Sequence, residues 1–119
     1  MNSLSQLPDL GYGEFFLWMI GKRKRFRVTG ISMQPLLQPG EEILLDPGAY
    51  KQKTPRINDL VVAIHPEKKG LEIIKRVSHI TEEDKVFLLG DNLAHSSDSR
   101  NFGAIPLQNI IGEVTSRFG

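Results

Sequence analysis

The pattern of apolar and polar positions changes near residue 26, from a helical signal to a series of short strands. An apolar run from Phe15 to Ile20 stops at Gly21, which is typical of a short helix that ends at a glycine. From Phe26 onward, apolar residues alternate with polar ones or form short runs between turn-forming residues. The expected strands lie around Phe26 and Val28 and over residues 43–45, 60–64, 71–80, 86–89 and 110–114.

These elements predict a mainly β fold of short, strongly bent sheets with one short helix at the N-terminus. The 119 residues are enough for one modest core and too few for a second independent module. We therefore divide the chain into an N-terminal extension over residues 1–22, with the short helix and a basic cluster, and one main domain over residues 23–119.

The apolar run and the basic cluster Lys22-Arg23-Lys24-Arg25 allow two interpretations. The run is far shorter than the roughly 20 apolar residues that a membrane-spanning helix needs. Aromatic residues followed by cations are typical of an interfacial membrane anchor, although so short a helix offers little membrane area. We favour packing of the helix against the main domain and leave peripheral membrane contact open.

The amino-acid composition limits which classes of function and which catalytic groups are possible. Lys and Arg total 15 against 14 for Asp and Glu, so the chain lacks the basic surplus expected of a nucleic-acid-binding protein. The absence of cysteine excludes a thiol nucleophile and fits a reducing compartment, which favours a cytoplasmic location. A covalent catalyst must then be an oxygen, and we expect neither a metal nor another cofactor.

Two side chains stand out as candidates for such chemistry. Ser32 lies in the turn-like stretch GISMQP, and Lys75 lies between Ile73 and Val77 in an alternating strand. Alternation places one cation, Lys75 or Arg76, on whichever face of that strand is buried. A lysine that burial keeps neutral can remove the proton of a serine hydroxyl, and Ser/Lys pairs are a known variant of the serine–base arrangement.

The histidines offer a competing site. Ser32 with one of His65, His79 or His95 and an aspartate would form a conventional triad, but no pattern brings His65 or His79 near the polar segment 90–106. The spacing of the three histidines also matches no local metal-ligand motif.

Four blocks of the sequence, taken in order, resemble the S26 signal peptidases. They are GISMQPLLQPGEEILLD, NDLVVAIHP, IIKRVSHI and GDNLAHSSDSRNFGAIPLQNIIGEV. The resemblance implies the fold that signal peptidases share with self-cleaving repressors. It also implies that Ser32 is the nucleophile, Lys75 the general base and Ser96 a hydroxyl that orients the lysine amine.

The same resemblance implies two ion pairs that hold the polar loop against the catalytic strand, Asp91 with Arg76 and Asp98 with Arg100. Both pairs are expected to be structural. One departure concerns Gly30, because many members carry a serine there whose hydroxyl helps to bind the oxyanion. Here the oxyanion would depend mainly on the Ser32 backbone N–H.

Substrate contacts are expected from Ile31, Met33 and the strand that begins at Leu60. Within the family, FRVTGISMQPLL, SSDSRNFGAIP and the ending VTSRFG resemble the proteases that mature nickel-type superoxide dismutase. This implies a protein partner, a dismutase precursor whose N-terminal extension is removed. A type I signal peptidase at a membrane surface and a self-cleaving regulator are the alternatives.

Overall fold

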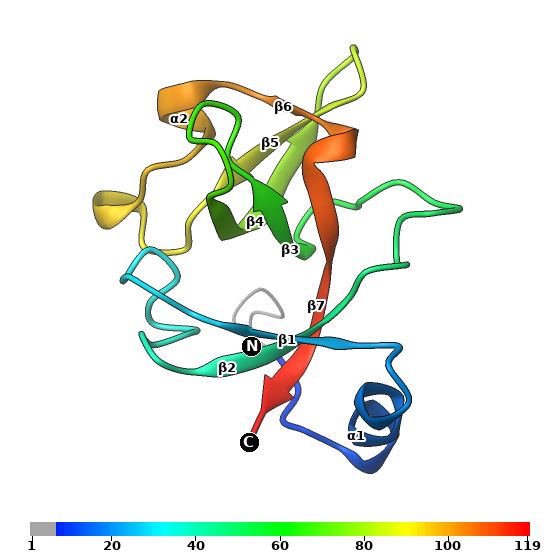
Figure 1. The fold of residues 1–119 in the computed structure, drawn as a ribbon. Coiled ribbons are helices and arrows are strands. Elements are labelled where there is room, and N and C mark those ends of the chain that lie inside the picture. The colour runs from blue at the N-terminus through cyan, green and yellow to red at the C-terminus, as the bar shows by residue number, and fades with distance from the viewer. Residues whose placement is uncertain (1–6) are drawn as a thin grey trace.

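The computed structural model describes residues 7–119 and shows one antiparallel sheet that coils around two hydrophobic cores (Figure 1). Within these residues the strand order is β1-β2-β7-β3-β4-β5-β6. The strands are β1 (Lys24–Arg27), β2 (Glu42–Asp46), β3 (Leu60–Ile64), β4 (Glu72–Ile80), β5 (Lys85–Leu89), β6 (Ile105–Pro106) and β7 (Ile110–Phe118). The helices are α1 (Tyr12–Met19), α2 (Ser99–Phe102) and the 3₁₀ turns η2 (Leu93–His95) and η3 (Leu107–Asn109). The expectation of a mainly β fold with a short N-terminal helix is confirmed.

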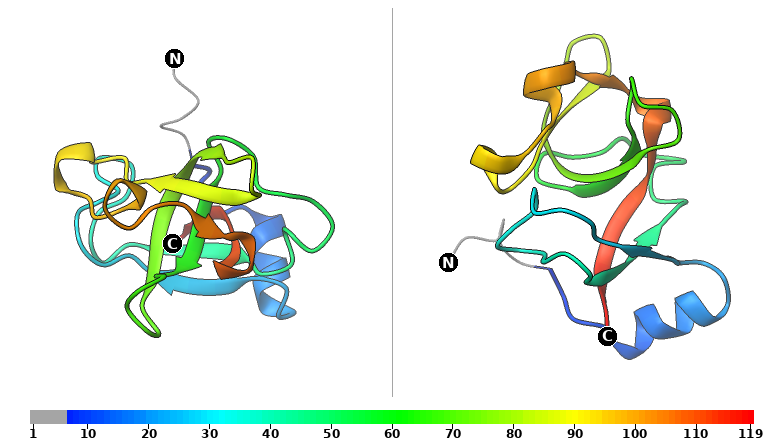
Figure 2. Two further views of the ribbon diagram at one scale, coloured as in Figure 1. Left: turned by 90° about the horizontal axis from the view of Figure 1, so that it is seen from above. Right: turned by 60° about the vertical axis from the view of Figure 1, so that its left-hand side comes forward.

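Strand β7 joins the two halves of the molecule. Its first residues pair with β3 and its later residues with β2, as in Gly112 opposite Val62 and Val114 opposite Leu45. Both pairings contain a register shift, and such bulges bend a sheet. Figure 2 shows the result, with β1 and β2 in one half, β3 to β6 in the other, and β7 running between them.

Strand β3 separates the two cores. Its sequence LVVAI is apolar throughout, and both of its faces are covered. Leu60 and Val62 face the first core, whose buried members also include Met33, Ile43 and Val114. Val61 and Ala63 face the second core, together with Val86, Leu88 and Ile105.

Strand β4 is covered on both faces as well, with Ile74 in the first core and Val77 in the second. The sequence pattern led us to expect one buried cation on this strand. The structure buries two, since Lys75 and Arg76 expose only 5% and 9% of their surface. The expectation was wrong because it assumed that one face of the strand meets solvent.

Helix α1 packs against the ends of β1 and β7. The Trp18 ring contacts the Phe118 ring at a centroid distance of 4.8 Å, and the Arg25 guanidinium lies over Phe118. The Glu14 carboxylate pairs with Arg23 and accepts a hydrogen bond from the Thr115 hydroxyl. Residues 1–6 of the expected N-terminal extension lie outside the described residues. Among residues 7–119, no helix is long and apolar enough to cross a membrane.

Candidate active site

The turn that carries Ser32 connects β1 to β2 and is held from both sides. Met33 and Leu37 are buried in the first core and anchor the turn to that core. The backbone N–H of Asn92 donates to the Ser32 carbonyl over 2.8 Å, and the Asn92 side-chain amide donates to the Ile31 carbonyl over 3.0 Å. Asn92 therefore fixes the serine relative to the polar segment, a role that the sequence analysis did not assign.

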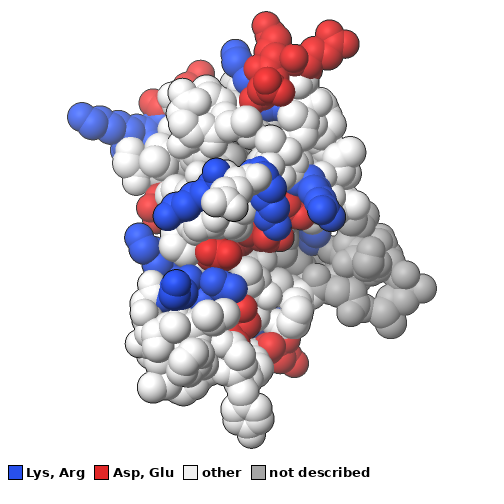
Figure 3. Space-filling model, turned by 90° about the vertical axis from the view of Figure 1, so that its right-hand side faces the viewer, with Lys and Arg blue, Asp and Glu red and all other residues white. Residues whose placement is uncertain are grey.

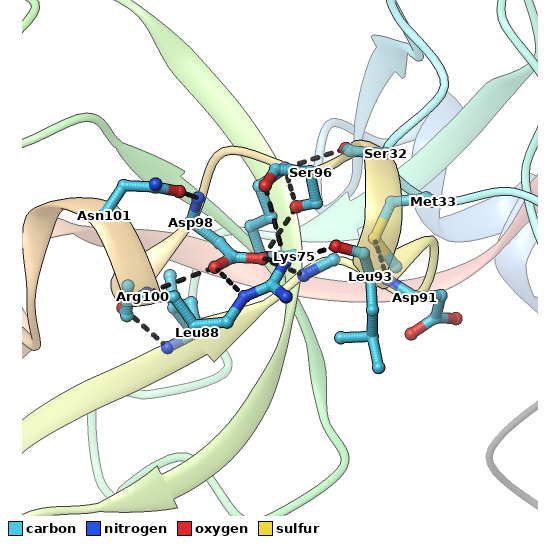
Figure 4. A network of polar contacts seen from close by, with 12 residues as sticks. Ser32, Met33, Lys75, Leu88, Asp91, Leu93, Ser96, Asp98, Arg100 and Asn101 are labelled. Carbon is cyan, nitrogen blue, oxygen red and sulfur yellow. Dashed lines mark hydrogen bonds and ion pairs between the residues drawn. The ribbon is translucent and has the colours of Figure 1, made fainter.

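Lys75 reaches Ser32 from the place where β5 separates from β4. Residues 72–76 of β4 pair with β3, whereas β5 pairs only with residues 76–80. The Lys75 amine nitrogen Nζ lies 2.7 Å from Oγ of Ser32 and 3.3 Å from Oγ of Ser96 (Figure 4). The structure thus brings together the three residues to which the resemblance gave catalytic roles.

The surroundings of Lys75 favour the neutral amine. Burial lowers the pKa of Lys75 below its ordinary value of 10.5, the Asp98 carboxylate partly opposes this, and the Arg100 guanidinium reinforces it. A neutral amine has a lone pair that can accept the Ser32 hydroxyl proton over the observed distance.

Asp98 controls the orientation of Ser96. The Ser96 hydroxyl donates to Oδ2 of Asp98 over 2.7 Å, which leaves its oxygen to accept from Lys75. Burial of Asp98 would raise its pKa, but hydrogen bonds from Arg100, the Gly90 N–H and Ser96 outweigh burial and lower the pKa to about 2. Asp98 is therefore a permanent anion at neutral pH, and its charge fixes which way the Ser96 proton points.

Both expected ion pairs are present in the polar segment. Asp98 and Arg100 approach to 2.9 Å, and Asp91 and Arg76 to 2.8 Å. Arg76 also donates to the Asn58 carbonyl, so the pair ties the segment to the start of β3. Asp98 does more than brace the loop, because one hydroxyl separates its carboxylate from the Lys75 amine.

Gly90 allows the two loops to approach each other. A Cβ atom on Gly90 would lie 2.7 Å from the Ser32 carbonyl oxygen and would overlap the Ser96 side chain. Real Cβ atoms do not come this close, so the position accepts only glycine without a rearrangement. The glycine of the motif GDN was the sequence signal for this contact, since a glycine often marks a place where another part of the backbone comes close.

The backbone N–H of Ser32 has no acceptor among residues 7–119 and is available to a developing oxyanion. Gly30 lies two residues earlier with a φ of +76°, in the region that favours glycine. A serine at this position would find open space but would strain the backbone.

A cavity of about 190 Å³ lies beside the Ser32 and Lys75 side chains. Ile31 is part of the exposed turn next to it, whereas Met33 and Leu60 are buried in the first core and do not line it. The expectation that Met33 and Leu60 shape the substrate pocket was therefore wrong, because both side chains turn into the first core. The lining consists of Phe26, Thr29, Ser32, Leu71, Glu72, Ile73, Ile74 and Lys75.

The histidines take other roles. His65 is buried, accepts hydrogen bonds at Nδ1 from the Glu67 and Lys68 N–H groups, and contacts the Phe102 ring. His79 stacks on Phe87, and His95 is exposed. Within the described part of the chain, no group of three His, Cys, Asp or Glu residues is placed to hold a metal ion.

Replacing Lys75 with methionine, which has similar length and no charge, should raise the free energy of unfolding at neutral pH. Because the folded pKa of Lys75 lies below 10.5, the unfolded chain binds more protons between these two values, and wild-type stability rises with pH there. The advantage of Lys75→Met should therefore shrink as the pH approaches 10.5. Urea denaturation of both proteins at several pH values up to 10.5 measures the difference in their free energies of unfolding. A difference that does not change with pH would contradict the explanation.

Gly90→Ala should cost about 1 to 3 kcal/mol of stability, the usual range for overpacking. Gly48→Ala is the matched control, because a Cβ there would meet its nearest neighbour at an ordinary 3.5 Å. We expect the control to change stability by less than about 0.5 kcal/mol. Equal melting curves for the two variants would show that the loops have room to separate.

Comparison with known proteins agrees with this geometry. The family described as "Signal peptidase, peptidase S26" matches residues 14–80 and 78–118. The chain is similar to mitochondrial inner membrane protease subunit 1 of Schizosaccharomyces pombe, with 33% identity over 75% of this chain and 69% of the relative. It is also similar to signal peptidase I V of Bacillus subtilis, with 27% identity over 76% of this chain and 82% of the relative. The chain belongs to the S26 family of serine peptidases.

Proposed function

We propose that this serine peptidase removes an N-terminal extension from a protein precursor in the cytoplasm, and that the precursor is a nickel superoxide dismutase. The observation that carries the reaction is the 2.7 Å approach of the buried Lys75 amine to the Ser32 hydroxyl, beside a cavity of about 190 Å³.

In the first step, neutral Lys75 takes the Ser32 hydroxyl proton while Oγ attacks the scissile carbonyl carbon. The Ser32 N–H stabilises the charge on the carbonyl oxygen. The C–N bond then breaks, and the lysine ammonium returns its proton to the leaving amine. Water, deprotonated by Lys75, hydrolyses the acyl-enzyme and restores both side chains.

The substrate lies as an extended strand beside Ser32. Among residues 7–119, the β4 edge from Glu72 to Lys75 has no strand partner on the side away from β3, and β1 is the end strand of the sheet. Phe26 and Thr29, in β1 and just after it, line the cavity together with this part of β4. A peptide strand between the two edges gains main-chain hydrogen bonds from both, while alternate side chains enter the cavity.

Two observations support the dismutase precursor as the substrate. The first is the sequence resemblance in FRVTGISMQPLL, SSDSRNFGAIP and VTSRFG. The second is the connection between β4 and β5, which is only the turn at residues 81–84, where larger signal peptidases resembling this chain carry an inserted domain. Removal of the extension would free the N-terminal histidine that helps to bind nickel in the dismutase.

Ser32→Ala and Lys75→Met should each lower kcat/KM for precursor cleavage by about a thousandfold or more, because the two side chains act as a unit. The wild-type rate should rise with pH as Lys75 loses its proton, with a midpoint below 10.5 because burial lowers this pKa. A retained rate in Lys75→Met would exclude lysine as the base.

The choice of substrate is tested by incubating the purified chain with intact dismutase precursor and sequencing the new N-terminus. We expect one cut that exposes the histidine, and kcat/KM more than about tenfold above that for a peptide spanning the junction, because remote contacts add binding energy. Ser32→Ala is the control for contaminating proteases. Cleavage of a signal-peptide substrate but not of the precursor would identify a general signal peptidase, and cleavage of the chain itself would identify a self-cleaving regulator.

A further inference from the structure

One carboxylate lies in the lining of the cavity beside Ser32. Apart from this carboxylate, Ser32, Lys75 and the Thr29 hydroxyl, the side chains of the lining are apolar. In the proposed reaction Lys75 acts in its neutral form, so the Glu72 carboxylate is then the only charge on the lining. A peptide in this cavity therefore meets one fixed negative charge.

The Glu72 carboxylate has no cation beside it. The residue is exposed, and the ion pairs among residues 7–119 do not include it. Other carboxylates are paired, such as that of Glu42, which lies 2.7 Å from the Arg25 guanidinium. Figure 3 shows a similar arrangement on one face of the molecule, where Asp and Glu side chains across its middle lie among Lys and Arg side chains. Glu72 is therefore available to a cation that a ligand supplies.

Glu72 is the first residue of β4 and lies on the edge that has no partner strand among residues 7–119. From Arg76 onward β5 occupies this edge, so a peptide that pairs with β4 beside Ser32 extends towards Glu72. The folded domain of a precursor is too bulky for the space between two strand edges, whereas its extension can enter as a single strand. Because a strand rises about 3.3 Å per residue, Glu72 lies level with a residue about three positions before the scissile bond.

Two explanations account for a charge at this position. Charged side chains on an open strand edge prevent pairing between molecules, and this role would not involve the substrate. However, a peptide strand bound along the edge covers the Glu72 carboxylate and removes water from it, which is unfavourable unless a cation takes the place of the water. An acidic side chain at the same point would add repulsion. The charge therefore discriminates between bound peptides.

We propose that Glu72 selects precursors whose extension carries lysine or arginine about three residues before the scissile bond. This inference rests on the peptidase activity proposed above and not on the identity of the precursor. Glu72 acts on the substrate and not on the base, because the charges that shift the pKa of Lys75 belong to Asp98 and Arg100. Glu72→Gln should therefore change the preference among substrates and leave the pH midpoint of cleavage unchanged.

The test compares peptides that span the dismutase precursor junction and carry lysine, glutamine or glutamate at the second, third or fourth residue before the scissile bond. Fluorescence anisotropy measures their binding to the Ser32→Ala chain, and kcat/KM is measured with the wild type. At one of these positions we expect lysine to exceed glutamine by about fivefold, the upper end for an exposed ion pair, and glutamate to be the weakest. High salt should reduce this preference, and Glu72→Lys should reverse it.

The matched control is Glu67→Lys, which makes the same change of charge at an exposed residue between β3 and β4 that does not line the cavity. The control should keep the wild-type preference. Absence of binding by every peptide, binding that ignores charge at all three positions, or a preference unchanged in Glu72→Lys would overturn the inference. So would aggregation of Glu72→Gln with an unchanged preference, because it would show that the carboxylate only protects the edge. The proposed function fails separately, if peptides bind but the wild type does not cut them.

Discussion

The structure depends on keeping the amine of Lys75 out of water without an opposite charge in direct contact. A buried ammonium without a paired anion is costly, so a lysine in this position gives up its proton more readily than a solvated one. Asp98 is the nearest anion in this arrangement, but the Ser96 hydroxyl stands between it and the amine. A direct ion pair would stabilise the charged amine and prevent it from acting as a base. The Ser96 hydroxyl between them lets Asp98 orient the hydrogen bond to the amine, while it weakens the stabilisation of the charged form by the carboxylate.

The two cores hold this arrangement from both sides. Met33 fixes the turn that carries Ser32 to the first core, and Val77 and Leu88 fix the second half of β4 and its neighbour β5 to the second core. Because β7 crosses from one half of the molecule to the other, the positions of Ser32 and Lys75 depend on one continuous strand. The short distance between them therefore depends on the whole sheet as well as on the loop contacts made by Gly90 and Asn92.

Strands β1 to β5 and β7 were predictable because apolar alternation and turn residues are local signals, and β3 was located correctly from LVVAI alone. Strand β6 and helix α2 lie in the polar segment 90–106, which carries no such signal, and were missed. The Ser32 and Lys75 pairing was suggested by sequence blocks that resemble a family, since no local pattern relates two residues 43 positions apart. Met33 and Leu60 were expected near the substrate but lie in the core, because a position next to Ser32 or at the start of a strand does not show which way a side chain points. The burial of both Lys75 and Arg76 was missed because alternation gives the face of a strand and not what covers it.

The edge of β4 that has no partner strand among residues 7–119 restricts which protein segments can pair with it. A backbone ladder forms only with a segment whose own N–H and C=O groups are free, and in a folded domain nearly all of these groups are already satisfied internally. The backbone conformation of a segment therefore decides whether it can bind, before its side chains contribute to specificity. In the proposed binding mode, the helices and sheets of folded proteins are therefore excluded as substrates, and a precursor junction is cleaved only while its backbone groups are free.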